Sequence, residues 1–252
     1  MSGVRGQEMT IDLRLGRWQD ALADVECDAL ICDPPYSERT HAANDQVAEW
    51  NKRGDKRYFQ GETPRNPIGY KHISDADAIA LVEHWAPRTR GWICVLTDHL
   101  LAPVFSAALE EAGRYVFSPL ACVDPGSRVR LAGDGPSQWS CWLIVSRPRS
   151  REWASWGTLR GAYVRGSRPA EKLAITGGKP LWLMQDILSD YTRPGDLVVD
   201  PYCGSGTTAI ASHRLGRSCI TSEQDPATHA MARARIDREL AQLGLPGMEV
   251  GV

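Results

Sequence analysis

Short apolar runs alternate along the chain with stretches of helical periodicity. Such alternation is typical of a mostly parallel sheet that helices cover on both faces. The pattern predicts strands over residues 10–15, 28–32, 92–96, 115–123, 140–146, 196–199 and 218–222. It predicts helices over residues 18–23, 75–87, 102–112, 181–191, 207–215 and 225–243. We therefore expect one α/β domain with three layers that extends over residues 1–252.

Two segments lack this periodicity. Polar, Gly and Pro residues dominate from Ser37 to His72, and a loop of this length inside a compact domain is usually functional or mobile. We interpret residues 37–72 as a mobile insertion loop. Arginine and lysine accumulate over residues 147–178, and we interpret this stretch as a small appended basic segment.

The composition narrows the class of protein. The 42% of hydrophobic and 24% of charged residues are ordinary for a soluble globular protein. The sequence contains no run of about 18 apolar residues, so we expect no membrane span. The first ten residues lack the apolar core of a secretory signal. Seven cysteines without a Cys-x-x-Cys pair are expected to be reduced thiols in a cytoplasm. The net charge of -2 means that a nucleic-acid enzyme must concentrate its positive charge locally.

A glycine-containing turn follows the predicted strand that ends at Val199. It reads Asp200-Pro201-Tyr202-Cys203-Gly204-Ser205-Gly206-Thr207-Thr208. Glycines at a strand-to-helix turn let backbone amides approach a ligand, and Glu223, at the end of the next strand, can bind both hydroxyls of a ribose. The alternative is that these residues form only a glycine-rich turn and a surface acid and bind no ligand. The third glycine of a pyrophosphate loop and the Walker lysine are absent, so we expect S-adenosylmethionine, with Asp200 accepting hydrogen bonds from its ammonium group.

A second motif, Asp33-Pro34-Pro35-Tyr36, follows the predicted strand over residues 28–32. Two adjacent prolines lack amide donors, so the strand stops there, and open α/β sheets place their active sites at such strand ends. Asp33 and the Pro34 carbonyl can accept both N–H groups of a planar amine, while Tyr36 can stack on an extruded base. A tight turn that only closes a strand is the alternative, and the presence of both motifs favours chemistry.

Both motifs resemble those of the amino-methyltransferases that act on adenine or on the exocyclic nitrogen of cytosine in DNA. Residues 33–36 match the catalytic D-P-P-Y of that family, and residues 200–208 match its cofactor loop D-P-F-x-G-S-G-T-T, with Tyr202 in place of phenylalanine. The stretch from Lys179-Pro180 to Gly195-Asp196 resembles the family's lysine–proline helix. Because the catalytic motif precedes the cofactor loop, the order resembles the circularly permuted beta group. The resemblance covers most of the chain and is weakest over residues 37–72 and 150–178.

The resemblance implies a Rossmann-like methyltransferase sheet in permuted order, and transfer of a methyl group from S-adenosylmethionine to a base amine in DNA. The aspartate at the head of the catalytic motif favours adenine N6. The alternatives are cytosine N4, RNA, a protein amide, or a cofactor- or DNA-binding protein without turnover. Arg17 departs from the family's acidic residue near the adenine ring, and Asp20 is the candidate substitute. The implied catalytic residues are Asp33, Pro34, Pro35 and Tyr36, and the implied cofactor-binding residues are Asp33, Lys179, Asp200, Pro201, Tyr202, Cys203, Gly204, Ser205, Gly206, Thr207, Thr208 and Glu223.

The expected partner is duplex DNA with the target base flipped out. The basic segment, residues 147–178, is the candidate target-recognition segment, and a solvated face with two core tryptophans, Trp153 and Trp156, is an equal alternative for it. A homodimer and a cognate restriction endonuclease are further hypotheses. No metal site is expected, because the six histidines show no metal-ligand spacing. The residues expected to contact DNA are Arg39, Lys52, Arg53, Lys56 and Arg57 of the loop and Arg160, Arg165 and Arg168 of the basic segment.

Overall fold

A computed structural model describes residues 9–42, 70–128, 138–169, 171, 173–175 and 177–243. Its central sheet has the strand order β1-β9-β8-β2-β3-β6-β5-β7, and β4 pairs with β6 beside this path. The strands are β1 (Ile11–Leu15), β2 (Ala29–Cys32), β3 (Ile93–Thr97), β4 (Tyr115–Val116), β5 (Leu120–Arg128), β6 (Gln138–Arg147), β7 (Ala162–Val164), β8 (Leu197–Asp200) and β9 (Ser218–Glu223). The pairs from β1 to β3 are parallel, whereas β6 is antiparallel to both β3 and β5.

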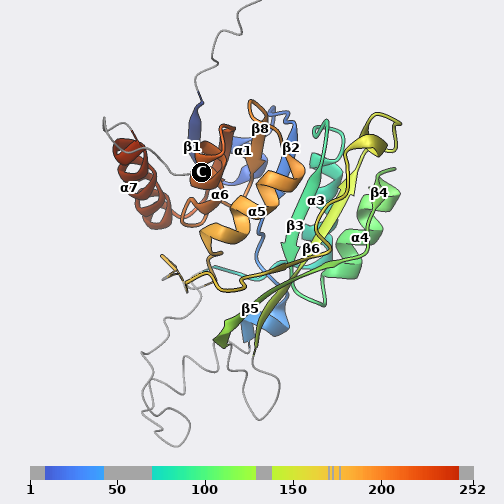
Figure 1. Cartoon of the computed structure of the whole chain (residues 1–252), viewed down its shortest axis with the longest axis horizontal. Coiled ribbons are helices and arrows are strands. Elements are labelled where there is room, and N and C mark those ends of the chain that lie inside the picture. Colours follow the sequence, from blue (N-terminus) through green and yellow to red (C-terminus); the bar gives the residue numbers. More distant parts are fainter. Residues whose placement is uncertain are drawn as a thin grey trace, which may run out of the picture.

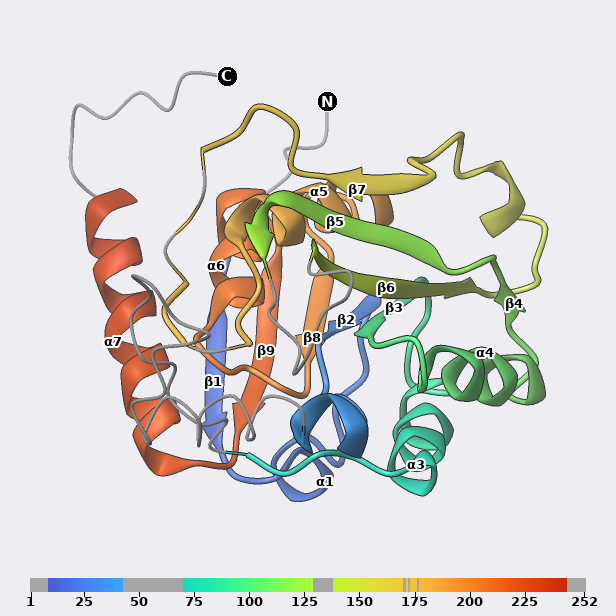
Figure 2. The same cartoon turned by 90° about the horizontal axis from the view of Figure 1, so that it is seen from below.

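Helices cover both faces of this sheet, as Figures 1 and 2 show. Residues of α3 and α4 pack with Trp18 of α1 and with one face of the central strands, and residues of α5 and α6 pack with the other face. On the second face, α7 packs against α6 and β1. The helices are α1 (Trp18–Ala21), α3 (Asp75–Trp85), α4 (Ala102–Glu111), α5 (Leu181–Tyr191), α6 (Thr207–Arg214) and α7 (Pro226–Leu243). The expected three-layer α/β fold is confirmed.

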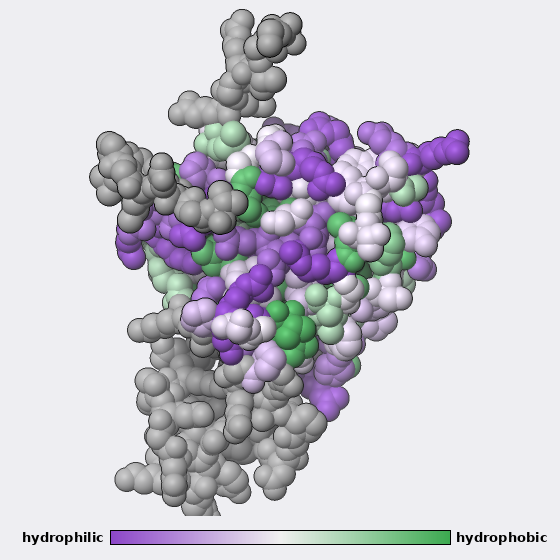
Figure 3. Space-filling model, viewed as in Figure 1, coloured by the Kyte–Doolittle hydropathy of each residue, from purple (hydrophilic) through white to green (hydrophobic). Residues whose placement is uncertain are grey.

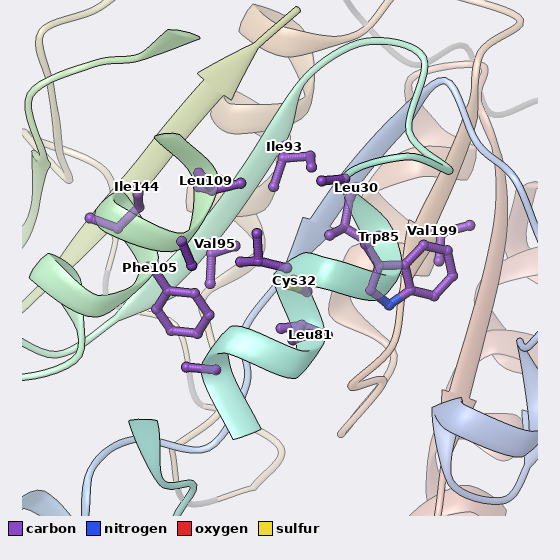
Figure 4. Packing of buried hydrophobic residues seen from close by; sticks show 14 of the residues in the cluster. Leu30, Cys32, Leu81, Trp85, Ile93, Val95, Phe105, Leu109, Ile144 and Val199 are labelled. Atoms are coloured by element: carbon purple, nitrogen blue, oxygen red, sulfur yellow. The ribbon is translucent and has the colours of Figure 1, made fainter. Parts of the chain in front are cut away.

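The central strands are apolar on both faces because both faces are covered. Along β2, Leu30 and Cys32 belong to the cluster under α3 and α4, whereas Ala29 and Ile31 belong to the cluster under α5. Figure 4 shows the first cluster, in which Leu30 and its neighbours on β3 and β8 pack with side chains of α3 and α4. All four residues of β2 are buried. The strand that leads into Asp33 is therefore held from both sides.

The antiparallel part of the sheet differs from the sequence pattern. The strand expected over residues 115–123 is split into β4 and β5, and both pair with β6. Pro119 lies in the break, where its missing N–H removes a ladder hydrogen bond. Residues 162–164 form β7, which pairs in parallel with β5. This part of the basic segment, residues 147–178, is thus built into the sheet.

The face of the molecule that includes α5 is mostly hydrophilic, with hydrophobic residues scattered over it (Figure 3). Among the described residues, no helix has the length and apolar character needed to cross a membrane.

Truncation of Leu143 tests the packing of the layer under α5. Leu143 is fully buried on β6, so Leu143→Ala leaves a cavity and is expected to lower the free energy of unfolding by about 2–5 kcal/mol. The exposed Leu100 provides a matched control, because Leu100→Ala should change this free energy by no more than about 0.5 kcal/mol. Equilibrium urea unfolding of both variants measures the difference, and equal effects would contradict the described core.

Candidate active site at the carboxyl edge of the sheet

The two sequence motifs lie at the ends of neighbouring strands. β2 and β8 are parallel and paired, with Leu30 opposite Val199. Asp33 follows the end of β2, and Asp200 is the last residue of β8. Glu223 ends β9, the strand on the other side of β8. Because parallel strands end at the same edge, the structure brings these three carboxylates to one edge of the sheet.

The turn after β8 requires glycine. Gly206 has a φ of +82° and is the N-cap of α6, a conformation that side chains with a Cβ rarely adopt. A Cβ at Gly206 would also lie 3.2 Å from two atoms of Ile236. Glu223 holds the turn from the next strand, since its carboxylate accepts hydrogen bonds from Gly204 N (3.0 Å) and Asp225 N (2.9 Å).

Asp200 lies beneath this turn and is buried. Its Oδ1 atom accepts a hydrogen bond from Tyr202 N (2.9 Å). Burial raises the pKa of Asp200 to about 7, and hydrogen bonds from Thr208 and Tyr202 reduce this rise, while Asp33 and Glu223 add to it. A positively charged ligand group beside this buried carboxylate would lower its pKa and stabilise its ionised form.

At the tip of β2, Asp33 forms an ion pair with Lys179. Lys179 Nζ donates to Asp33 Oδ2 at 2.5 Å and lies 4.9 Å from the centre of the Tyr36 ring. Burial raises the pKa of Asp33, and the Lys179 ammonium opposes this rise. The other carboxylate oxygen, Asp33 Oδ1, and the Tyr36 hydroxyl are buried and form no well-aligned hydrogen bond within the described residues. Buried polar atoms usually have partners, so Asp33 Oδ1 is an acceptor available to an N–H donor.

The segment before α5 closes this edge of the sheet. A Cβ at Gly204 would lie 3.4 Å from Ile175, so Ile175 lies across the glycine turn, and a Cβ at Gly177 would lie 2.7 Å from the Tyr70 hydroxyl. Lys179 Nζ also donates to Gly177 O at 3.2 Å. This segment therefore connects the glycine turn to the Asp33 carboxylate.

Two residues that the motifs did not indicate also organise the site. Glu171 accepts hydrogen bonds from Leu181 N (2.7 Å) and Trp182 N (3.1 Å), so it caps the first turn of α5 just after Lys179. Trp18 donates from its indole nitrogen to the Tyr202 hydroxyl at 3.0 Å. The hydroxyl that distinguishes Tyr202 from phenylalanine thus accepts a hydrogen bond from Trp18. The two residues are far apart in the sequence, so no local sequence pattern indicates this contact.

The remaining residues of the cofactor-loop motif lie at the start of α6. Cys203, Ser205, Thr207 and Thr208 are buried, and Arg235 of α7 donates to both Ser205 Oγ (3.0 Å) and Thr207 Oγ1 (2.9 Å). These side chains support the turn from within the domain. Near the other flank, Arg17 is the N-cap of α1, and Asp20 is exposed on that helix.

The arginines expected to contact DNA are mostly paired with aspartates. Arg160 binds Asp190 (2.7 Å), Arg165 binds Asp124 (2.5 Å) and Arg168 binds Asp186 (3.0 Å). The side chain of Arg165 is only 13% exposed, whereas those of Arg160 and Arg168 are about half exposed, at 45% and 46%. Arg39 is exposed on the helical residues 38–42. The other predicted DNA contacts lie outside the described residues: Lys52, Arg53, Lys56 and Arg57.

The two tryptophans of the basic segment pack inward. Their rings stack with centroids 5.2 Å apart, and Trp156 donates from its indole nitrogen to Asp190 O at 2.8 Å. No three His, Cys, Asp or Glu side chains within the described ranges gather closely enough to hold a metal ion.

Comparisons with known proteins identify a family that the chain matches. A family model described as a DNA methylase matches residues 36–234. The type II methyltransferase M2.DpnII of Streptococcus pneumoniae is 38% identical over 106 residues, which is 42% of this chain and 33% of that protein. The matched stretches span only about a third to two fifths of the curated relatives' length.

Two solved structures share the fold. The M1.HpyAVI–SAM complex matches with a TM-score of 0.58 and 20% identity, and the match covers 90% of this chain and 100% of that one. The PvuII DNA methyltransferase, described as cytosine-N4-specific, matches with a TM-score of 0.53 and 12% identity over 93% of both chains.

The raised pKa of Asp200 predicts a pH-dependent loss of stability. The folded protein binds the proton of this carboxyl more tightly than the unfolded chain does, so the contribution of Asp200 is fully present below pH 3.8 and is lost as the pH rises through about 7. Asp200→Asn keeps the acceptor for Tyr202 N and removes the titration. The loss of stability between pH 5 and pH 8, measured by urea unfolding, should therefore be smaller in this variant. The exposed Asp24→Asn serves as the control, and an unchanged loss in Asp200→Asn would contradict the burial of a titrating carboxyl.

Proposed function

The chain belongs to the N6/N4 DNA methylase family, and from this premise we propose that it transfers a methyl group from S-adenosylmethionine to the exocyclic amine of a base in DNA. The observation that supports this proposal most directly is the position of Asp33 Oδ1. This atom is buried, receives no well-aligned hydrogen bond from the described residues, and lies at the tip of the strand beside the one that leads into the glycine turn. An acceptor for an amine and a turn suited to a nucleoside cofactor lie at one edge of the sheet.

The residues present fit S-adenosylmethionine. Asp200 is a buried carboxylate that a cation would ionise, and Glu223 ends the strand beside β8, where it can bind ribose hydroxyls. The glycine turn exposes backbone rather than side chains to the ligand. When bound, S-adenosylmethionine supplies an electrophilic methyl group on a sulfonium centre.

The chain's own residues would orient and activate the amine. Asp33 Oδ1 and the Pro34 carbonyl accept its N–H groups, which directs the nitrogen lone pair away from the carboxylate. Asp33 then stabilises the positive charge that develops on the nitrogen. Tyr36 stacks on the base, and the buried surroundings exclude water.

Lys179 would act before the amine arrives. In the structure its ammonium neutralises Asp33 and lies near the Tyr36 ring. A buried carboxylate without a counter-charge is costly. The ammonium on Asp33 Oδ2 therefore favours the ionised carboxylate and leaves Oδ1 to accept an N–H group of the base. Lys179 would then lie at the boundary between the cofactor and base sites.

We propose adenine N6 as the target, because an aspartate heads the catalytic motif. Cytosine N4 is the second candidate, since its amine presents the same N–H groups and one structural relative is described as cytosine-N4-specific. Mass spectrometry of nucleosides from DNA methylated by the purified protein separates the two. Parallel assays with RNA and protein test the other acceptors, and cofactor binding without transfer to any of them would indicate a non-catalytic protein.

We propose duplex DNA with a flipped base as the substrate. Among the predicted DNA contacts that the structure describes, Arg39 and the half-exposed Arg160 and Arg168 can offer positive charge to phosphates. Arg165 is better placed to hold β7 beside β5 through its buried pair with Asp124. That the chain forms a homodimer and that it acts with a cognate restriction endonuclease stay predictions.

Removal of the Asp33 carboxylate should abolish turnover and leave cofactor binding largely intact. Asp33→Ala is expected to lower kcat by at least about a hundredfold, because transition-state stabilisation is lost, and to change the Kd for S-adenosylmethionine little. Tritium transfer to DNA and calorimetric titration measure the two quantities. Glu38→Ala, which removes an exposed carboxylate five residues along the chain, is the matched control. Near-normal turnover in Asp33→Ala would refute the mechanism.

Cofactor affinity should depend on the ionisation of Asp200. Because a positively charged ligand favours the ionised form and the pKa of Asp200 is about 7, the Kd for S-adenosylmethionine should fall as the pH rises from 6 to 7.5. Asp200→Asn should bind about tenfold more weakly or worse and show a flatter profile. The ligand's own titration is the same for both proteins, so the difference between the profiles isolates Asp200. Parallel profiles would argue against this role.

A further inference from the structure

Asp98 lies at the same edge of the sheet and has no part in the motifs. It follows Thr97, the last residue of β3, and β3 pairs in parallel with β2. As a residue, Asp98 is 7% exposed. The tips of β2 and β3 are therefore neighbours, and Asp98 faces the chain that leaves Tyr36.

The two oxygens of Asp98 bind different segments. Asp98 Oδ1 accepts hydrogen bonds from Leu100 N (3.1 Å) and Leu101 N (3.0 Å), which hold the turn that leads into α4. Asp98 Oδ2 accepts from Ser37 N (3.0 Å), Ser37 Oγ (2.5 Å) and Thr40 Oγ1 (2.6 Å). One carboxylate thus joins the turn before α4 to the residues that follow the catalytic motif.

The backbone of the catalytic motif has few hydrogen-bond donors of its own. Pro34 and Pro35 have no N–H to donate, so the turn depends on bonds made at its ends. Tyr36 O accepts a hydrogen bond from Ile73 N at 3.2 Å, and Ser37, the next residue, is buried against Asp98. Burial alone would raise the pKa of Asp98, but the donors of Ser37 and Thr40 hold it below its usual value. An ionised acceptor makes stronger hydrogen bonds.

We propose that Asp98 is a positioning residue for methyl transfer: its Oδ2 atom fixes Ser37 and thereby sets the orientation of Asp33 and Tyr36 toward the target amine. This inference rests on the proposed function and adds a residue to it. In-line transfer requires reacting atoms held in near-attack geometry, and a displacement of about 1 Å at the reacting centre can cost about a hundredfold in rate. Asp98 touches neither substrate nor cofactor in this role and acts through the motif.

Two kinds of variant separate positioning from support of the turn before α4. Asp98→Ser keeps an acceptor for the amides of that turn but is too short to reach Ser37. Ser37→Ala combined with Thr40→Val leaves Asp98 and its bonds to the turn in place and removes two of the donors to Oδ2. Ser106→Ala removes a hydroxyl that donates to Ala102 O inside α4, and it is the control for loss of a serine hydrogen bond.

We expect kcat for DNA methylation to fall about tenfold or more in Asp98→Ser and in Ser37→Ala/Thr40→Val, with the Kd for S-adenosylmethionine and the melting temperature close to those of the wild type. Ser106→Ala should retain kcat. When Asp98→Ser is combined with Ser37→Ala/Thr40→Val, the fold-losses in kcat should not multiply, because both changes break the same contact. In an Asp33→Ala background, Asp98→Ser should have no further effect on residual transfer.

Other outcomes overturn the proposal in distinguishable ways. If the wild-type protein methylates DNA and these variants keep its kcat, Asp98 has no positioning role and the proposed function stands. If kcat falls only together with cofactor binding and melting temperature, Asp98 is a structural residue. If the wild-type protein transfers no methyl group to any nucleic acid, the proposed function fails, and the role of Asp98 fails with it.

Discussion

The parallel pairing of β2 with β8 is the contact on which the rest of the site depends. It brings Asp33 and Asp200 to the same edge, where Asp200 is buried and Asp33 is partly buried, and where the charge of Asp33 raises the free energy of ionising Asp200. A folded protein tolerates such crowding of carboxylates only with compensation. Lys179 supplies a counter-charge to Asp33, whereas Asp200 relies on hydrogen bonds and a raised pKa. The edge is therefore electrostatically prepared for cations and for N–H donors.

The layers and the two motifs could be predicted from the sequence because their causes are local. Buried strands such as β2 are continuous apolar runs, and α5 and α7 have helical periodicity over lengths that leave little ambiguity. The Pro-Pro pair and the glycine turn mark the ends of their strands by backbone chemistry alone. Each of these features is decided by residues close together in the chain.

The rest of the site depends on contacts between distant residues. Asp98 meets Ser37 across 61 positions, and Trp18 meets Tyr202 across 184. Nothing near these residues in the sequence reveals such partners. β7 was likewise hidden in a glycine- and arginine-rich stretch, because its place depends on the burial of Tyr163 and on the bond from its hydroxyl to Asp190. The basic character of that stretch suggested DNA contact, but aspartates of β5 and α5 neutralise much of it.

The separation between β2 and β8 also has a consequence for how the chain folds. Asp28, just before β2, accepts a hydrogen bond from Leu197 N, 169 positions away. During synthesis, β2 emerges long before its neighbour β8, so one side of this strand waits without its final partner. Contacts of such long range are entropically expensive and form late. The edge that carries Asp33, Asp200 and Glu223 is therefore completed only when β8 and β9 insert, and a partly folded chain cannot bring these three carboxylates together.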